Sequence, residues 1–338
     1  MNNTLKLLCL LYAGLLNSAC QSQEKPVVNL DPIVQRAKET SLYSENVNWK
    51  EVDQKFKELT GQQETLAGLK PGLEYLINSL GDKHATFRSA KDFSILASYT
   101  GPRDKEDKRD GNFINTVIND ISAEFSYDLI DDVGYLKVVG INPALNVQEQ
   151  AMLINNGLKD LKGKGVDKWI LDLRYNGGGN INPMIAGLAP LIGDGFIGGG
   201  VDAQGTLVRN YEIKAGLFYD TENLVSEMDD LPVFQDHEKV AVLLSRYTTS
   251  SGEMLAIAFK GRKNTRFIGE ATSGYVTGNG FDRIGEELLM IISQTIFVDR
   301  NEVVYDQNVG VDEAMEFVPT DDKSKDLQIQ KAISWLNN

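Results

Sequence analysis

A cluster of small hydroxyl residues, Tyr247-Thr248-Thr249-Ser250-Ser251-Gly252-Glu253, could supply a nucleophile. It follows the apolar run 239–244 (KVAVLL), which predicts a buried strand, and leads into an apolar-periodic helix over 253–259 that Gly261 closes. A serine in such a turn can expose its hydroxyl while nearby main-chain N–H groups remain available to hold an oxyanion. An ordinary Ser/Thr N-cap explains the same residues, so the turn alone leaves both readings open.

A serine nucleophile needs a base, and the chain contains only two histidines. Neutral imidazole titrates in the range that suits removal of a hydroxyl proton. His84 lies in Asp82-Lys83-His84, just after a helical segment. His237 follows Gln235-Asp236 in a polar linker, where we expect a surface residue. A lone histidine is commonly structural, so the residue types alone do not assign a role to His84.

A glycine cluster at 177–179 ends a second buried strand, predicted over 166–173, before a helix over 183–192. The cluster matches neither G-x-G-x-x-G nor a G-K-[ST] ending, which argues against a dinucleotide or phosphate loop. Glycine N–H groups can approach a reacting carbonyl closely because no side chain intervenes. A plain structural turn is the alternative.

The composition excludes several classes of function. The 338 residues carry a net charge of −14, which argues against nucleic acid and against anionic membrane surfaces as partners. The only cysteines are Cys9 and Cys20. Cys9 lies in a predicted signal segment, so cysteine catalysis and cysteine metal sites are excluded, and two histidines make a His-rich zinc site improbable. We therefore predict no metal and no cofactor.

The N-terminus has the order of residues found in a secretory signal. Lys6 precedes the apolar run 7–16, and Ser18-Ala19-Cys20 follows it. The run is too short to span a bilayer comfortably. Cys20 after Ser-Ala resembles a bacterial lipoprotein signal, in which that cysteine is lipidated; cleavage without lipidation is the alternative. We expect a signal peptide over 1–20, a polar tether over 21–30 and export to the bacterial cell envelope, as a periplasmic or membrane-anchored protein.

The rest of the chain divides by its pattern of apolar residues. Helical spacing of Trp49, Val52, Phe56 and Leu59 predicts a helical N-terminal cap over 31–80. A connecting segment over 81–132 follows. Alternating strands and helices over 133–338 predict an α/β core with parallel pairing. The glycine-containing stretch 193–236 suits an insertion or a substrate-facing flap.

Taken together, three motifs resemble one family. Asp172-Leu173-Arg174-x-Asn176-x-Gly178-Gly179, then Thr248-x-Ser250-x-x-Glu253, then Gly269-Glu270-x-Thr272-x-Gly274 look like the tail-specific, or C-terminal processing, serine peptidases. The resemblance covers roughly residues 80 to 320. It implies a crotonase-like (ClpP/crotonase-type) α/β core with a helical cap.

The resemblance also implies roles for individual residues. The nucleophile would be Ser250. The branch with a Ser–Lys dyad has its lysine just after Gly-Glu-x-Thr-x-Gly, where this chain has Tyr275. A second branch, tricorn-like or nisin-resistance-protein-like, uses the histidine of a D-x-H motif near the cap–core junction, which would make His84 the general base.

The remaining site residues are also implied by the resemblance. Tricorn-like relatives supply a carboxylate shortly before a closing Gly-Val, and Asp306 is the nearest acid here. Gln307 could align there instead, and the nisin-resistance type would need only a dyad. The oxyanion hole would be the N–H groups of Gly178 and Ser251.

These inferences combine into one expected function. We predict an exported serine endopeptidase or C-terminal processing peptidase that acts on peptides or proteins through a Ser250 acyl-enzyme. The segment 85–132 is too short for the PDZ domain of the Lys branch, so none is predicted. The alternative is a catalytically inactive, peptide-binding envelope protein on the same fold. The membrane would be reached only through the N-terminal lipid anchor, and the sequence does not predict an oligomeric state.

Overall fold

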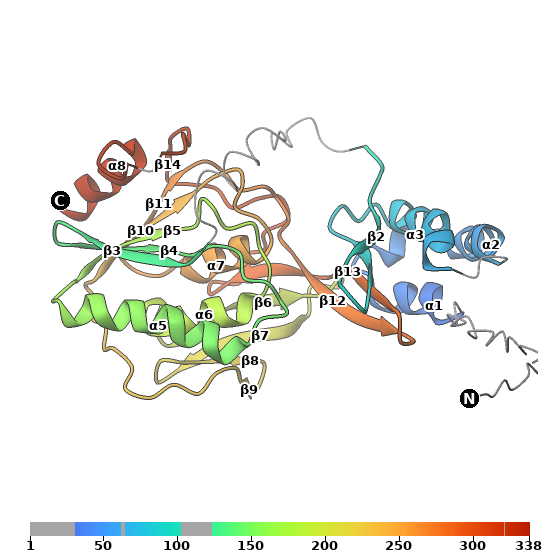
Figure 1. Ribbon diagram of the computed structural model, residues 1–338, viewed down its shortest axis with the longest axis horizontal. Coiled ribbons are helices and arrows are strands. Elements are labelled where there is room, and N and C mark those ends of the chain that lie inside the picture. Colours follow the sequence, from blue (N-terminus) through green and yellow to red (C-terminus); the bar gives the residue numbers. More distant parts are fainter. Residues whose placement is uncertain (1–30, 62–64, 103–123, 321) are drawn as a thin grey trace, which may run out of the picture.

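The computed structural model describes residues 31–61, 65–102, 124–320 and 322–338 (Figure 1). It consists of a larger lobe built on two sheets and a smaller lobe that contains the first helices of the described chain. The predicted signal segment, Cys20 and the tether lie outside the described residues. Within the described ranges, no helix is long and apolar enough to cross a membrane.

The smaller lobe contains α1 (Asp31–Thr40), the short 3₁₀ helix η1 (Ser44–Asn46), α2 (Trp49–Thr60) and α3 (Leu66–Leu80). The Asn48 side chain accepts a hydrogen bond from Glu51 N and so caps α2. Gly81, in the left-handed region at φ +68°, ends α3. The helices share one apolar cluster, whose members include Val52, Phe56, Leu69, Leu73 and Leu76. The spacing over 31–80 thus predicted helices correctly, while its status as a separate cap remains a prediction.

A six-stranded sheet forms the centre of the larger lobe. Its order is β14 (Glu313–Ala314), β11 (Thr265–Gly269), β10 (Lys239–Leu244), β5 (Lys168–Asp172), β4 (Val133–Lys137) and β3 (Ser126–Ile130). All neighbours pair in parallel except β3 with β4. Because successive side chains of β10 point to opposite faces, Val240 and Val242 enter one apolar cluster, and Ala241 and Leu243 another.

Helices cover both faces of this sheet. α5 (Val147–Gly163), α6 (Ile181–Ile192) and α7 (Ser251–Phe259) cover one face, where α6 and α7 also contact a second sheet, and α8 (Leu327–Leu336) covers the opposite face (Figure 1). Every residue of α7 is buried, as is α6 from Pro183 onward. The chain therefore has a mixed α/β fold, within which a crotonase-type core remains a prediction.

The second sheet is antiparallel and was not predicted. Its eight strands are β1 (Thr86–Ser89), β2 (Ile95–Ser98), β6 (Gly195–Val201), β7 (Leu207–Lys214), β8 (Leu217–Asp220), β9 (Asn223–Leu224), β12 (Thr277–Ile284) and β13 (Leu288–Asp299). The stretch 193–236 is therefore not simply a flap, because it supplies four of these strands. A Cβ on Gly199 would lie 2.0 Å from the carbonyl oxygen of Arg209 on β7, so this glycine permits close strand pairing.

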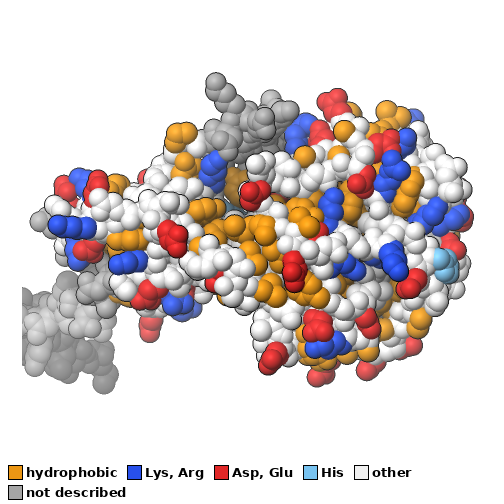
Figure 2. Space-filling model, turned by 180° about the vertical axis from the view of Figure 1, so that it is seen from behind, with side chains coloured by type: hydrophobic (Ala, Val, Ile, Leu, Met, Phe, Trp, Pro, Cys, Tyr) orange, Lys and Arg blue, Asp and Glu red, His pale blue; other side chains and the backbone are white. Residues whose placement is uncertain are grey.

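Strand β13 joins the two lobes. Its first half pairs with β1 and places Leu288, Met290 and Ile292 in the apolar cluster of the smaller lobe. Its second half pairs with β6 and places Phe297 in the main core. On the face of the molecule shown in Figure 2, hydrophobic side chains gather over the middle, between the lobes. The strand therefore fixes the position of the smaller lobe against the larger one.

Candidate active site

Ser250 lies between the end of β10 and the start of α7, at φ +54° and ψ −115°. A positive φ is uncommon for a residue with a side chain and costs about 1–3 kcal/mol, so surrounding contacts must maintain it. Thr248 Oγ1 donates to the carbonyl oxygen of Leu173 at 2.9 Å, and Thr249 N donates to that of Asn176 at 3.0 Å. These bonds attach the turn to the glycine loop after β5.

The glycine loop contacts Ser250 directly. Gly178 has φ +99°, and a Cβ there would lie 3.1 Å from both Ser250 Cβ and the carbonyl oxygen of Thr249. Ser251 Oγ donates to the carbonyl oxygen of Gly179 at 2.5 Å. The predicted nucleophile and both predicted oxyanion residues therefore lie at one place. The Gly178 N–H, however, donates to Asn176 Oδ1 at 3.0 Å, so it would have to leave or share that acceptor to bind an oxyanion.

Glu253, one turn into α7, holds Ser250 from the other side. Its Oε2 accepts hydrogen bonds from Ser250 N at 2.7 Å and Tyr275 N at 2.8 Å, and its Oε1 accepts from Gly274 N at 2.8 Å and Thr272 Oγ1 at 2.5 Å. Burial raises the pKa of Glu253 to about 7, and these hydrogen bonds oppose the rise. In the sequence, Glu253 stands out only as a residue of the Thr-x-Ser-x-x-Glu motif. The Ser250-x-x-Glu253 spacing of a capping box was the available signal for its contact with the turn.

His84 lies half-buried at the junction of the lobes. Its ring packs edge-on against Tyr275, with the ring centroids 5.2 Å apart. Since Tyr275 N also donates to Glu253, one residue joins the predicted base to the carboxylate that holds Ser250 N. His84 Nδ1 lies 2.8 Å from Thr277 Oγ1, at the start of β12. The other histidine, His237, is exposed, as the sequence predicted.

A match to a protein-family model identifies the family of this chain. The model of peptidase family S41 matches residues 132–316, more than half of the chain. The chain belongs to peptidase family S41. The predicted family and the predicted enzyme class, a serine-type peptidase, are thereby confirmed.

Individual relatives agree with this membership. The nisin-resistance protein of Lactococcus lactis subsp. lactis is 25% identical over 273 residues, 79% of this chain and 76% of that protein. The chloroplastic carboxyl-terminal-processing peptidase 2 of Arabidopsis thaliana is 30% identical over 142 residues, 42% of this chain but only 24% of that protein. A solved lipoprotein structure from Streptococcus agalactiae has a TM-score of 0.68 at 21% identity, over 91% of this chain and 94% of that one, and so shares the fold.

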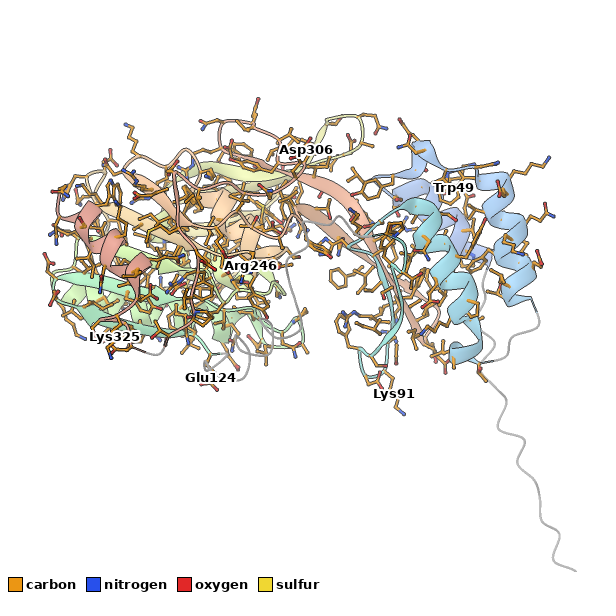
Figure 3. All side chains as sticks on the ribbon, turned by 90° about the horizontal axis from the view of Figure 1, so that it is seen from above. Trp49, Lys91, Glu124, Arg246, Asp306 and Lys325 are labelled. Carbon is orange, nitrogen blue, oxygen red and sulfur yellow. The ribbon has the colours of Figure 1, made fainter. Side chains whose placement is uncertain are left out.

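Asp306, which the family resemblance suggested as a third site residue beside Ser250 and His84, is exposed. Figure 3 places it near the junction, on the side of the larger lobe and apart from the helix that carries Trp49. None of the hydrogen bonds or ion pairs among the described residues joins Asp306 to His84. The imidazole instead contacts the hydroxyl group of Thr277, a partner that the sequence did not indicate. A role for Asp306 remains a prediction.

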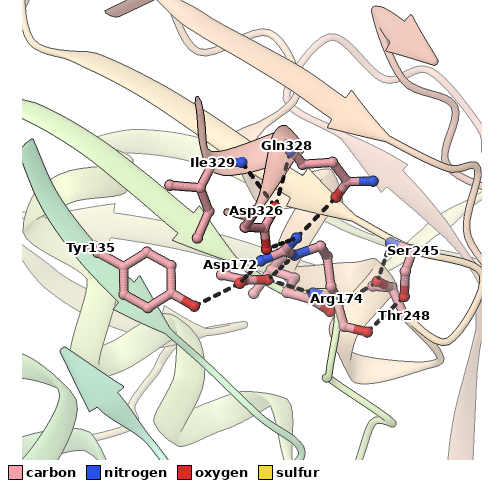
Figure 4. Close-up of polar contacts among 9 residues, drawn as sticks. Tyr135, Asp172, Arg174, Ser245, Thr248, Asp326, Gln328 and Ile329 are labelled. Carbon is pink, nitrogen blue, oxygen red and sulfur yellow. Dashed lines mark hydrogen bonds and ion pairs between the residues drawn. The ribbon is translucent and has the colours of Figure 1, made fainter. Parts of the chain in front are cut away.

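The Asp-Leu-Arg part of the S41 motif forms a buried ionic cluster (Figure 4). Arg174 pairs with Asp172 at 2.6 Å and with Asp326, the N-cap of α8, at 2.7 Å. Tyr135 OH donates to Asp172 at 2.7 Å, and Ser245 Oγ donates to the carbonyl oxygen of Arg174 at 2.6 Å. This cluster ties β5, the segment after β10 and α8 together beneath the glycine loop. Within the described ranges, no group of three or more His, Cys, Asp or Glu side chains comes together as a metal site.

Proposed function

We propose that this S41 peptidase hydrolyses peptide bonds through an acyl-enzyme on Ser250, with His84 as general base. Ser250 Oγ attacks the substrate carbonyl carbon as its proton passes to His84 Nε2, and the carbonyl electrons move to the oxygen. The tetrahedral intermediate collapses with cleavage of the C–N bond, and the proton on Nε2 passes to the leaving amine. Water then repeats the sequence on the ester and releases the acid.

The observation that carries this proposal is the positive-φ conformation of Ser250 against Gly178. A turn that served only as a helix N-cap has no need of this conformation, because N-cap residues ordinarily have β-region angles. Five contacts of the turn maintain it, to Leu173, Asn176, Gly179, Glu253 and the glycine at 178. Strain maintained by so many contacts is typical of a functional position.

The proposed oxyanion donors are the N–H groups of Gly178 and Ser251. Ser251 is the first residue of α7, so its N–H belongs to the groups that a helix leaves without an internal acceptor. The Gly178 N–H competes with Asn176 Oδ1 for its hydrogen. An oxyanion is a stronger acceptor than a neutral amide oxygen, so a charged intermediate would draw this N–H toward itself. Removal of one such donor typically costs 10²–10³-fold in rate.

The substrate class follows from the family and from one relative's name. The Arabidopsis thaliana relative is named for carboxyl-terminal processing. We therefore include C-terminal segments of peptides or proteins among the proposed substrates, beside internal peptide bonds. No cofactor takes part in the proposed steps. The division into a cap over 31–80, a connecting segment over 81–132 without a PDZ domain and a core over 133–338 belongs to this proposal.

A fluorophosphonate probe tests the assignment of Ser250 and His84. We expect the wild type to be labelled, Ser250→Ala not at all, and His84→Ala at least about 10³-fold more slowly. The matched controls are Ser334→Ala and His237→Ala, both at exposed positions, and these should react like the wild type. Equal labelling of the wild type and Ser250→Ala would place the reactive group elsewhere and overturn the proposal.

We also propose that the protein is exported and anchored to the cell envelope by a lipid on Cys20. Support comes from the order Lys6, apolar run, Ser18-Ala19-Cys20, and from the fold shared with a Streptococcus agalactiae lipoprotein. Growth with an alkyne-tagged fatty acid should label the wild type and the control Cys9→Ala, but not Cys20→Ala. Labelling of Cys20→Ala would contradict the anchor.

A further inference from the structure

A continuous chain of hydrogen bonds leads from the His84 ring to a fully buried carboxylate. His84 Nδ1 lies 2.8 Å from Thr277 Oγ1, which lies 2.9 Å from Ser293 Oγ. Ser293 Oγ in turn donates to Asp82 Oδ1 at 2.9 Å. Asp82 and Ser293 have no exposed surface. The three partners come from the loop after α3, from β12 and from β13, so the chain forms only in the folded junction.

The other contacts of Asp82 favour its ionised form in this position. Ser293 N donates to Oδ2 at 2.8 Å, and His84 N donates to Oδ1 at 3.0 Å. Main-chain N–H groups can only donate, so both carboxylate oxygens face donors. Burial raises the pKa of Asp82, and these bonds oppose the rise. The titratable side chain of Tyr43 also lies near this carboxylate, and burial together with the charge of Asp82 raises its pKa to about 12.

The carboxylate fixes the direction of every bond in the chain. Ser293 Oγ donates its only hydrogen to Asp82, because this hydrogen bond is shorter than the one to Asn279 Oδ1 at 3.3 Å and its acceptor is charged. It must therefore accept from Thr277 Oγ1, and this uses the only hydrogen of Thr277. Thr277 can then only accept from His84 Nδ1, which must carry a hydrogen. The neutral imidazole is left with its lone pair on Nε2.

We propose that Asp82, Ser293 and Thr277 are positioning residues that hold His84 as the Nδ1–H tautomer with Nε2 as the basic atom. This inference rests on the proposed function, in which Nε2 receives the proton of Ser250. When that proton arrives, the imidazolium keeps its Nδ1–H bond to Thr277, and the negative charge of Asp82 stabilises the cation at the far end of the chain. This chain of hydrogen bonds takes the orienting role for which the family resemblance suggested Asp306. Its acid, Asp82, is buried, so no exposed acid is needed.

The tautomer can be measured without any substrate. The full chain contains two histidines, so His237→Ala leaves a single imidazole whose ¹⁵N signals need no assignment. At a pH where the ring is neutral, we expect a protonated Nδ1 and an unprotonated Nε2. In the Thr277→Val background the acceptor is gone, and the ring should shift towards the Nε2–H form that free imidazole side chains prefer. Thr277→Ser restores the hydroxyl and should restore Nδ1–H.

Reactivity gives the second measurement. With the fluorophosphonate probe, Thr277→Val should react about 10- to 100-fold more slowly than the wild type, and Thr277→Ser within about threefold of it. Asp82→Asn should move the acidic midpoint of labelling to lower pH, because the imidazolium loses the stabilising charge. A control variant, Thr206→Ala in the exposed turn before β7, should change neither rate nor midpoint.

Two outcomes would overturn the inference. One is an Nε2–H tautomer in the His237→Ala protein itself. This variant leaves the hydrogen-bond chain unchanged, so misfolding of the junction would not explain the result. The other is a Thr277→Val protein that keeps both Nδ1–H and the wild-type labelling rate. Failure of the proposed function is distinguishable from either, because a wild type that does not react with the probe leaves the ¹⁵N measurement intact.

Discussion

Two buried carboxylates, Glu253 and Asp82, organise the two halves of the site in different ways. Glu253 accepts hydrogen bonds from three main-chain N–H groups and so ties the main chain of Ser250 to that of Gly274 and Tyr275. Asp82 accepts two main-chain N–H groups but reaches its target, the His84 ring, only through two hydroxyls. A nucleophile on a strained turn needs its main chain held, whereas a ring that rotates about two bonds needs its side chain oriented.

The comparison predicts that loss of Glu253 costs more stability than loss of Asp82. Glu253→Ala at pH 8 leaves three main-chain N–H groups and the Thr272 hydroxyl without their buried acceptor, and we expect a loss of about 3 kcal/mol or more in the free energy of unfolding. Asp82→Ala leaves fewer donors without an acceptor and should lower the free energy of unfolding by about 2 kcal/mol.

Urea unfolding measures both losses, with Glu58→Ala on the exposed face of α2 as the control that should change stability by less than about 0.5 kcal/mol. We call the hydrogen bonds that Glu253 accepts from main-chain N–H groups the backbone clamp, and the Asp82–Ser293–Thr277–His84 bonds the hydroxyl chain. A larger loss for Asp82→Ala than for Glu253→Ala would show that the hydroxyl chain, and not the backbone clamp, holds the junction together.

The pH dependence of stability sharpens the contrast further. Burial raises the pKa of Glu253 from 4.5 to about 7, so between these values the folded protein retains a proton that the unfolded chain has released. The resulting stabilisation is fully present below pH 4.5 and is lost as the pH rises through 7. Glu253→Gln cannot titrate. Relative to this variant, the wild type should therefore lose up to about 3 kcal/mol between pH 4.5 and 8.

Unfolding free energies of the two proteins at pH 4.5, 6 and 8 test this expectation. Asp82 is present in both, so its own titration cancels in the difference. Parallel curves across this range would mean that Glu253 keeps an ordinary pKa, with its donors fully offsetting the burial.

The two halves also differ in how far the sequence reveals them. The Ser250 half has local signals: apolar runs predicted β10 and α7, and the resemblance of the motifs at 172–179 and 248–253 to a peptidase family implied that Gly178 and Ser251 would lie beside Ser250. Each of these signals spans a few neighbouring residues, where periodicity and turn chemistry act.

The His84 half depends on contacts between distant segments. Thr277 and Ser293 are ordinary hydroxyl residues about 200 positions from His84, and nothing in their neighbourhood marks them as partners of a ring. β12, which carries Thr277, was not predicted, and β6 was missed because its glycines within 195–201 hide strand alternation. The two hydroxyls lie on the neighbouring strands β12 and β13, and the pairing of β13 with β1 brings them to the loop that carries His84. A single sequence does not display the register of strands as distant as β1 and β13.

The smallest expected effect concerns Gly178, which belongs to the Ser250 half alone. Gly178→Ala places a side chain at φ +99°, with its Cβ 3.1 Å from Ser250 Cβ, so we expect a loss of about 1–2 kcal/mol in stability and slower labelling by the fluorophosphonate. The ¹⁵N tautomer of His84 should not change, because no bond of the hydroxyl chain passes through the glycine loop. Gly163→Ala, at the end of α5 with no atom within 4 Å of the new Cβ, is the matched control and should be neutral or stabilising by up to about 1 kcal/mol. A change of tautomer in Gly178→Ala would show that the two halves are coupled through their packing, and that the backbone clamp and the hydroxyl chain act as one unit.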